Sequence, residues 1–127
     1  MITEDYVSFE TAKLLKEKGF CENCRTGYVP DTGTFINGIP IGNDSIHVVN
    51  IPAPTQALAM KWLMENHNLF IQPLAGVTGG KWWYDFDIIP VNGRDIKWDY
   101  YMEMSGEYGS PEEAIEAAIK YCLENLV

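Results

Sequence analysis

Hydrophobic and polar residues alternate with the period of an α-helix between residues 55 and 70. Five positions at steps of three and four are predicted to share one helix face: Leu58, Ala59, Trp62, Leu63 and Asn66. Met60 and Met64 widen this face, so that only a narrow polar strip remains, consisting of Gln56, Lys61, Glu65 and Asn68. Thr55 is a suitable N-cap for the helix. A helix this apolar needs cover on most of its circumference, and we therefore predict a core helix beside a sheet.

Two further helices are predicted near the ends of the chain. Ser8 can cap a first helix that ends at Gly19, because glycine readily adopts the left-handed conformation that follows many helices. The last helix begins at Ser110 as N-cap, with proline in the first helical position and Glu113 completing a capping box. Its inward stripe is predicted to consist of Ala114, Ile115, Ala118, Cys122, Leu123 and Leu126.

Strict alternation of side-chain type predicts two strands between residues 82 and 104. In the first strand, Trp82, Tyr84, Phe86 and Ile88 share one face, and Trp83, Asp85, Asp87 and Ile89 share the other. In the second, Ile96, Trp98, Tyr100, Met102 and Met104 oppose Lys97, Asp99, Tyr101 and Glu103. Residues 92–95, which begin with Asn-Gly, join the strands as a hairpin turn. The alternation predicts a buried aromatic face against the helices and a solvent-exposed opposite face.

Shorter strands are predicted elsewhere, at residues 26–29, 34–36, 39–41, 45–51 and 69–75. Asn37-Gly38 is a preferred dipeptide for two-residue turns, so we expect a hairpin turn there, and Pro40 confines the following strand to a sheet edge. Residues 78–80 are predicted to form another turn. The chain is therefore expected to be one α+β domain, residues 1–127, with three helices packed on one face of a largely antiparallel sheet. The element order is α-β-β-(β)-α-β-β-β-α.

Composition and charge narrow the classes of partner. The 127 residues are 46% hydrophobic and 21% charged, with a net charge of −9. Without a basic cluster, binding to nucleic acid or to an anionic membrane is disfavoured. No apolar run reaches the ~20 residues of a membrane helix, and the first ten residues are acidic, unlike a signal peptide. Together with three cysteines, an odd number, these features predict a cytoplasmic protein.

Cys21 and Cys24 have the C-x-x-C spacing of zinc and dithiol sites. A structural zinc site needs about four ligands, and the sequence adds only Cys122, His47 and His67. A redox pair needs a helix N-terminus to lower a thiol pKa, whereas this pair follows a predicted helix C-terminus. We therefore expect incidental thiols, with metal binding by Cys21 and Cys24 as the alternative, and we expect no cofactor.

Two other motifs have simpler explanations than catalysis. Residues 76–81 partly match a phosphate-binding loop, but Ala75 and Trp82 stand where that motif requires glycine and serine or threonine. A hairpin turn explains these glycines better. His67 has no serine or cysteine motif and no orienting acid nearby in the sequence, which favours a helix-end imidazolium or a packed histidine.

Four residues of the predicted hairpin are candidate contacts for a partner or ligand: Trp83, Tyr101, Asp85 and Asp99. Trp83 and Tyr101 are large rings on the predicted solvent face. Such rings are expected to be covered by residues 26–50 or by a second subunit, or else to form a partner-binding patch or a stacking platform for a planar ligand. Asp85 and Asp99 share this face, where carboxylates hold a cation, act as an acid–base pair, or simply remain solvated.

Three segments resemble a known group of sequences: MITEDYVSFETAKLLKEKGF, APTQALAMKWLMENHNLFI and YGSPEEAIEAAIKYCLENLV. They are similar to small hypothetical proteins from phages and integrated elements of gut anaerobes. The resemblance covers about half of the chain and excludes residues 21–50 and 81–104. That family carries no known activity, catalytic residue or cofactor, so the resemblance implies only a cytoplasmic accessory protein of a mobile element.

The sequence as a whole predicts a non-enzymatic accessory or host-interaction protein that binds a protein partner or itself. This expectation rests on the absence of a convergent catalytic set and on the uneven charge, with residues 81–116 acidic and residues 26–80 poor in charge. The alternative is a protein that binds or sequesters a small, nucleotide-like molecule. This alternative is motivated by the glycine-rich residues 26–50, expected to lie near Trp83 and Tyr101.

Overall fold

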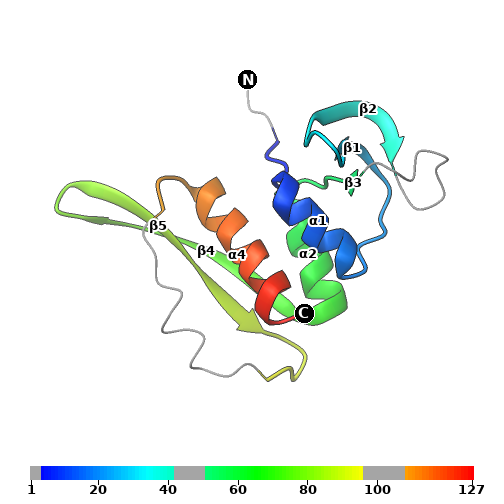
Figure 1. Ribbon diagram of the computed structural model, residues 1–127. Helices are drawn as coiled ribbons and strands as arrows, with labels where there is room; N and C mark the ends of the chain where they lie inside the picture. Colours follow the sequence, from blue (N-terminus) through cyan, green and yellow to red (C-terminus); the bar gives the residue numbers. More distant parts are fainter. Residues whose placement is uncertain (1–3, 42–50, 96–107) are drawn as a thin grey trace. The chain divides into compact units, whose positions relative to one another are not determined.

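The chain folds into helices and antiparallel sheets, as a computed structural model describes for residues 4–41, 51–95 and 108–127 (Figure 1). The element bounds are α1 (Phe9–Glu17), β1 (Cys24–Tyr28), β2 (Phe35–Ile41), β3 (Ile51–Pro52), α2 (Gln56–His67), β4 (Leu69–Thr78), β5 (Lys81–Pro90) and α4 (Pro111–Asn125). These elements confirm the predicted α+β class. The strand expected at residues 96–104 and most of the one at 45–51 lie outside the described residues.

The described strands form two antiparallel sheets where the sequence suggested one. The first sheet has the order β2-β1-β3, and the second consists of β4 and β5. By its internal contacts the chain divides into two compact units, residues 1–59 and residues 60–127, and α2 begins in the first and ends in the second. The prediction of a single domain stays a prediction.

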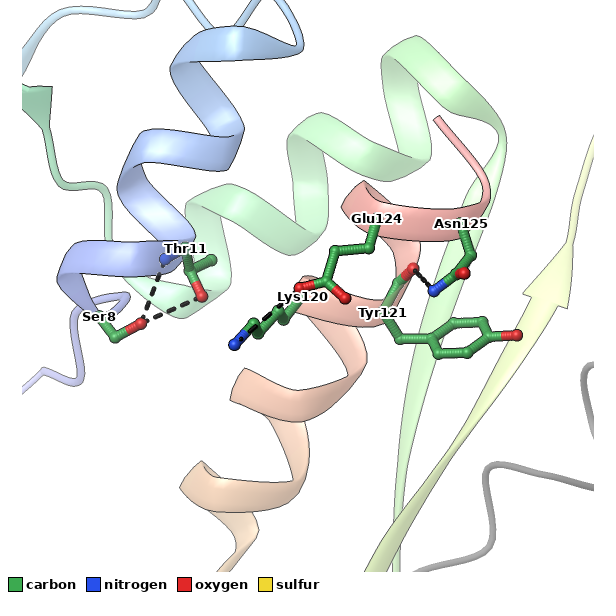
Figure 2. Close-up of polar contacts among 6 residues, drawn as sticks. All are labelled: Ser8, Thr11, Lys120, Tyr121, Glu124 and Asn125. Atoms are coloured by element: carbon green, nitrogen blue, oxygen red, sulfur yellow. Dashed lines mark hydrogen bonds and ion pairs between the residues drawn. The ribbon is translucent and has the colours of Figure 1, made fainter.

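The ends of α1 follow the signals that the sequence predicted. The Ser8 hydroxyl accepts a hydrogen bond from the Thr11 amide at 3.2 Å, and the two side chains are joined as well (Figure 2). At the other end, Gly19 has a φ of +99°, and the Phe20 amide donates to the Leu15 carbonyl at 2.9 Å. This is the Schellman closure of a helix, and it buries the Phe20 side chain.

The three-stranded sheet corrects the expected turn at Asn37-Gly38. These residues lie inside β2, which runs antiparallel to β1 and forms an edge of the sheet, as Pro40 requires. The hairpin turn lies earlier, at residues 29–34, where the Val29 amide donates to the Thr34 carbonyl and Gly33 has a φ of +68°. The Pro-Asp-Thr-Gly sequence in this loop is typical of a turn and competes better for the reversal than Asn-Gly does.

The burial of α2 differs from the predicted helix face. Ala59, Trp62 and Leu63 are buried as expected, but Leu58 and Asn66 are exposed. Gln56, placed in the polar strip by its residue type, is buried in the first turn. Thr55 caps the helix as predicted, since its hydroxyl accepts from the Leu58 amide at 3.1 Å.

The second sheet is a long two-stranded hairpin on which α4 packs. Leu69 pairs with Pro90 at its base and Thr78 with Lys81 at its tip, so that Gly79 and Gly80 form a two-residue turn. Both glycines have positive φ, as a type I′ turn requires. A turn also lies at Asn92-Gly93, where both residues have positive φ and the Arg94 amide donates to the Val91 carbonyl. The second strand of the hairpin predicted there lies outside the described residues, so the hairpin stays a prediction.

Helix α4 supplies the core of residues 60–127. Its buried side chains are Ala114, Ala118, Ile119, Cys122 and Leu123. The predicted stripe omitted Ile119, and Ile115 and Leu126 are only half-buried. Ser110 caps the helix by accepting from the Glu113 amide, while the Glu113 carboxylate accepts from Gly109, one residue before the expected capping-box partner. Near its C-terminal end the helix carries the Lys120–Glu124 ion pair and a hydrogen bond from Asn125 to the Tyr121 carbonyl (Figure 2).

Candidate functional site

The β4–β5 hairpin has two faces of opposite character. Paired residues share a face, and the face on which the core lies is apolar along its whole length: Leu69, Ile71, Pro73, Ala75, Val77, Trp82, Tyr84, Phe86, Ile88 and Pro90. The other face carries every charged residue of the hairpin, namely Lys81, Asp85 and Asp87. Such a division is typical of a sheet that is covered on one side only.

Helix α4 covers only part of the apolar face. Leu69, Ile71, Phe86 and Ile88, near the base of the hairpin, are buried. A helix of 15 residues is about 22 Å long, whereas a strand of 10 residues spans about 33 Å, so the helix is too short to cover the hairpin. The Gly79–Gly80 end accordingly extends beyond α4 (Figure 1).

The part of this face that the described residues leave uncovered, which we call the free-end face, consists of Pro73, Ala75, Val77, Trp82 and Tyr84. Val77 and Trp82 are cross-strand partners, and 54% and 66% of their respective surfaces are exposed. The prediction that Trp82 is buried in an aromatic row is therefore wrong. The alternation placed it correctly on the core side of the strand, but the core ends before it.

Trp83 lies on the opposite face and is held by its own hairpin. Its ring packs so closely over Gly76 that a Cβ at that position would lie 2.2 Å from a ring carbon. The indole N–H donates to the Thr78 hydroxyl at 3.1 Å. Gly76 and Trp83 are direct cross-strand partners, and the ring thus fills the space that the glycine leaves. Trp83 is half-buried, so its ring stabilises the hairpin while part of its surface stays accessible.

Asp85 shares this face with Trp83, as the sequence predicted. One of its carboxylate oxygens accepts from the Phe86 amide at 2.8 Å. Tyr101 and Asp99, the other two candidate contacts, lie outside the described residues. The structure therefore brings together two of the four predicted residues, on the side of the hairpin away from the free-end face.

Cys21 and Cys24 differ in environment. Cys21 is exposed, whereas Cys24 is buried and its thiol donates to the Glu22 carbonyl. Burial, and secondarily the Glu22 carboxylate, raises the pKa of Cys24 to about 11. A thiol protonated at neutral pH is a poor nucleophile and a poor metal ligand. Within residues 4–41, 51–95 and 108–127, His, Cys, Asp and Glu form no group of three or more that is arranged to hold a metal ion.

His67 is a packed histidine at the end of α2. Its ring meets the Trp62 ring edge-on, with 4.8 Å between centroids. Burial, and secondarily the nearby Arg94 guanidinium, lowers the pKa of His67 below 6.5. Arg94 itself donates to the His67 carbonyl at 2.7 Å and to the Leu126 carbonyl. Arg94 is therefore the cation at these two helix ends. Of the two alternatives for His67, a helix-end imidazolium and a packed histidine, the contacts favour the packed histidine.

A pocket of about 360 Å³ lies within residues 1–59. Its walls come from the N-terminal segment, β1, β2 and the first turn of α2. Polar groups on these walls include Glu4, Asn23, Arg25 and Asn37, and Tyr6 contributes an aromatic ring. These residues are scattered along the chain and match no motif, so the sequence alone did not identify them.

None of the helices in the described part of the chain is long and apolar enough to cross a membrane. No protein-family model matches the chain, and no curated protein or solved structure is significantly similar to it. The free-end face and the pocket are therefore the two candidate functional sites.

Proposed function

We propose that this chain is a non-enzymatic accessory protein of a phage or mobile element, and that it binds a protein partner through the free-end face. The observation that carries the proposal is the exposure of Val77 and Trp82 on a face without any charged residue. Adjacent exposed apolar residues with a polar surround are typical of protein interaction sites. Tryptophan is also among the residues most enriched at the centres of interfaces.

The charges beside the free-end face indicate the kind of partner. Tyr84 is bridged to Tyr108, and Glu112 and Glu113 follow at the exposed start of α4. Helix α4 carries four glutamates and one lysine, and the whole chain has a net charge of −9. An apolar patch on a chain of this negative charge complements a partner whose interface has an apolar centre within a basic surface. A second copy would bring together two chains of the same negative charge, which makes self-association the less favoured occupant.

The test compares the wild-type chain with a Val77→Ser/Trp82→Ser double variant in affinity capture from host lysate. Both residues are exposed, so the variant should keep its fold, which circular dichroism checks. Phe70→Ser is the matched control, because Phe70 is 40% exposed but lies on the other face of β4. We expect the double variant to lose about 2 kcal/mol or more of binding energy, roughly 30-fold in Kd, for each partner.

The outcomes separate partner classes. Retention of basic proteins by wild type and Phe70→Ser, with loss in the double variant and elution by salt, supports the proposal. Light scattering that shows a dimer lost in the double variant would assign the face to self-association instead. Equal retention of every captured protein by the double variant would contradict binding through this face.

A further inference from the structure

The pocket within residues 1–59 carries an inference that does not rest on the hairpin. The pocket volume of about 360 Å³ lies at the lower end of the range of small-molecule sites, roughly 300–1,000 Å³. Its walls combine an aromatic ring, apolar side chains and several hydrogen-bonding groups. In sites of this size the polar groups fix the orientation of a bound small molecule.

Part of the pocket wall is already committed to the fold. The Thr26 hydroxyl donates to the Ala53 carbonyl at 2.6 Å, and the Thr55 hydroxyl accepts from the Leu58 amide. The Cys24 thiol is engaged with a main-chain carbonyl. These groups set the shape of the pocket and have little capacity left for a ligand.

The side-chain amides of Asn23 and Asn37 differ from these groups in their hydrogen bonding. Both residues are exposed, and within the described part of the chain no hydrogen bond occupies either amide. Each amide offers a donor and an acceptor side by side. That arrangement matches the edge of a nucleobase, as in the bidentate pairing of asparagine with adenine.

An irregularity of the sheet lies at the pocket wall. Cys24 pairs with Ile41 and Thr26 pairs with Asn37, so that one residue of β1, Arg25, faces three residues of β2. This is the only register shift between described strands of the first sheet. Such bulges redirect side chains and are over-represented beside functional sites. Arg25, within the irregularity, and Asn37, at its edge, both line the pocket.

The charges of the pocket select among ligands of similar shape. Its lining carries one basic residue, Arg25, and one acidic residue, Glu4, and therefore has no net charge. Nucleotides with several phosphates are held by clusters of cationic and main-chain donors. In a chain of net charge −9, a single arginine beside a glutamate does not supply such a cluster. Glu4 is instead suited to accept from a base amino group.

From this combination we infer that the pocket binds an uncharged nucleobase or nucleoside. Tyr6 provides the ring against which the base packs, and its own ring is supported by Phe35, 5.3 Å away between centroids. Asn23 and Asn37 read the edge of the base, with Glu4 as an additional acceptor. Arg25 lines the pocket at the register shift.

The experiment is calorimetry of the full chain with adenosine, guanosine, cytidine and uridine, together with AMP and ATP. We expect saturable binding of at least one nucleoside with a Kd below about 1 mM, and weaker binding of its phosphorylated forms. Asn23→Ala and Asn37→Ala, both exposed, should each weaken binding about tenfold, as expected from the loss of one or two hydrogen bonds. Gln72→Ala removes an exposed amide in β4 and should leave the affinity unchanged.

Three results would overturn the inference. These are the absence of binding by all four nucleosides, tighter binding of ATP than of adenosine, and equal affinities in the two asparagine variants and Gln72→Ala. Circular dichroism establishes that each variant is folded. The Val77→Ser/Trp82→Ser variant should bind the nucleoside normally, which separates failure of this site from failure of the free-end face.

Discussion

Arg94 hydrogen-bonds main-chain carbonyls at the C-terminal ends of two helices within residues 60–127. Its guanidinium donates to the carbonyls of His67 and Leu126, which stand at the C-terminal ends of α2 and α4. The next turn of chain is fixed by a hydrogen bond from Asn92 to the Asn68 side chain, and both asparagines have positive φ. A cation at two helix C-termini favours both macrodipoles, and it also disfavours a second positive charge on the neighbouring imidazole.

The protonation of His67 should therefore weaken the fold in acid. Its pKa is lowered in the folded chain, first by burial and then by Arg94, while the unfolded chain titrates near 6.5. As the pH falls below 6.5 the unfolded state binds more protons, so the free energy of unfolding should decrease until the folded pKa is passed. Well above pH 6.5 both states are neutral at this residue and no effect is expected.

Urea unfolding of wild type and His67→Gln between pH 7.5 and 5 checks this expectation, since the glutamine variant should lack this part of the acid-induced decrease. Nuclear magnetic resonance of the His67 ring gives the folded pKa directly. In Arg94→Met the pKa should rise only part of the way to 6.5, because burial remains. A folded pKa at or above 6.5 in wild type would contradict the prediction.

At the scale of the secondary-structure elements, the β4–β5 hairpin is closed by one two-residue turn. Gly79 and Gly80 both have positive φ, and a Cβ at either position would meet no neighbouring atom. Asparagine tolerates this conformation and restricts the unfolded chain more than glycine does. Gly79→Asn should therefore stabilise the chain by roughly 0.5 kcal/mol, whereas Gly79→Val should destabilise it by about 1–2 kcal/mol.

Chemical denaturation monitored by tryptophan fluorescence measures both turn variants. Gly80→Asn serves as a companion, because the second position of a type I′ turn has the same requirement. Equal stability of the asparagine and valine variants would show that the hairpin does not adopt this turn in solution.

Local signals predicted the ends of these elements well. Ser8, Gly19, Thr55 and Ser110 act through hydrogen bonds and φ values within a few residues, so they are legible in the sequence. The residues at 30–33 also carry a turn signal, but the turn was predicted at Asn37-Gly38. Pairing with β1 holds these two residues inside a strand. Here pairing with a neighbouring strand outweighed a local turn preference.

The candidate sites were much less predictable than the elements. The sequence identified the core side of β5 but not where the core ends, because that depends on the length and placement of α4, some 20 residues later. A comparison of the two lengths, about 22 Å against 33 Å, would have indicated an uncovered end. The pocket offered no such signal, since Glu4, Asn23 and Asn37 meet only after the first sheet has formed.

At the scale of the whole molecule, the two compact units share helix α2, which bears on whether they unfold together. The continuous helix α2 contributes residues 56–59 to one unit and residues 60–67 to the other. Unfolding of either unit would remove support from part of this helix, and short isolated helices are marginal in water. We therefore predict a single cooperative transition, as expected of one domain.

Removing one helix cap in each unit tests this prediction. Ser8→Ala and Ser110→Ala each remove an N-cap acceptor, which costs about 1 kcal/mol and should lower the Tm by about 4 °C. In calorimetry both variants should shift the same single transition, with calorimetric and van't Hoff enthalpies equal. Ser8→Asp and Ser110→Asp retain the cap acceptor and should stay near the wild-type Tm. Two transitions, each shifted by only one of the alanine variants, would instead establish two independently folding units, because each cap would then stabilise only the unit that contains it.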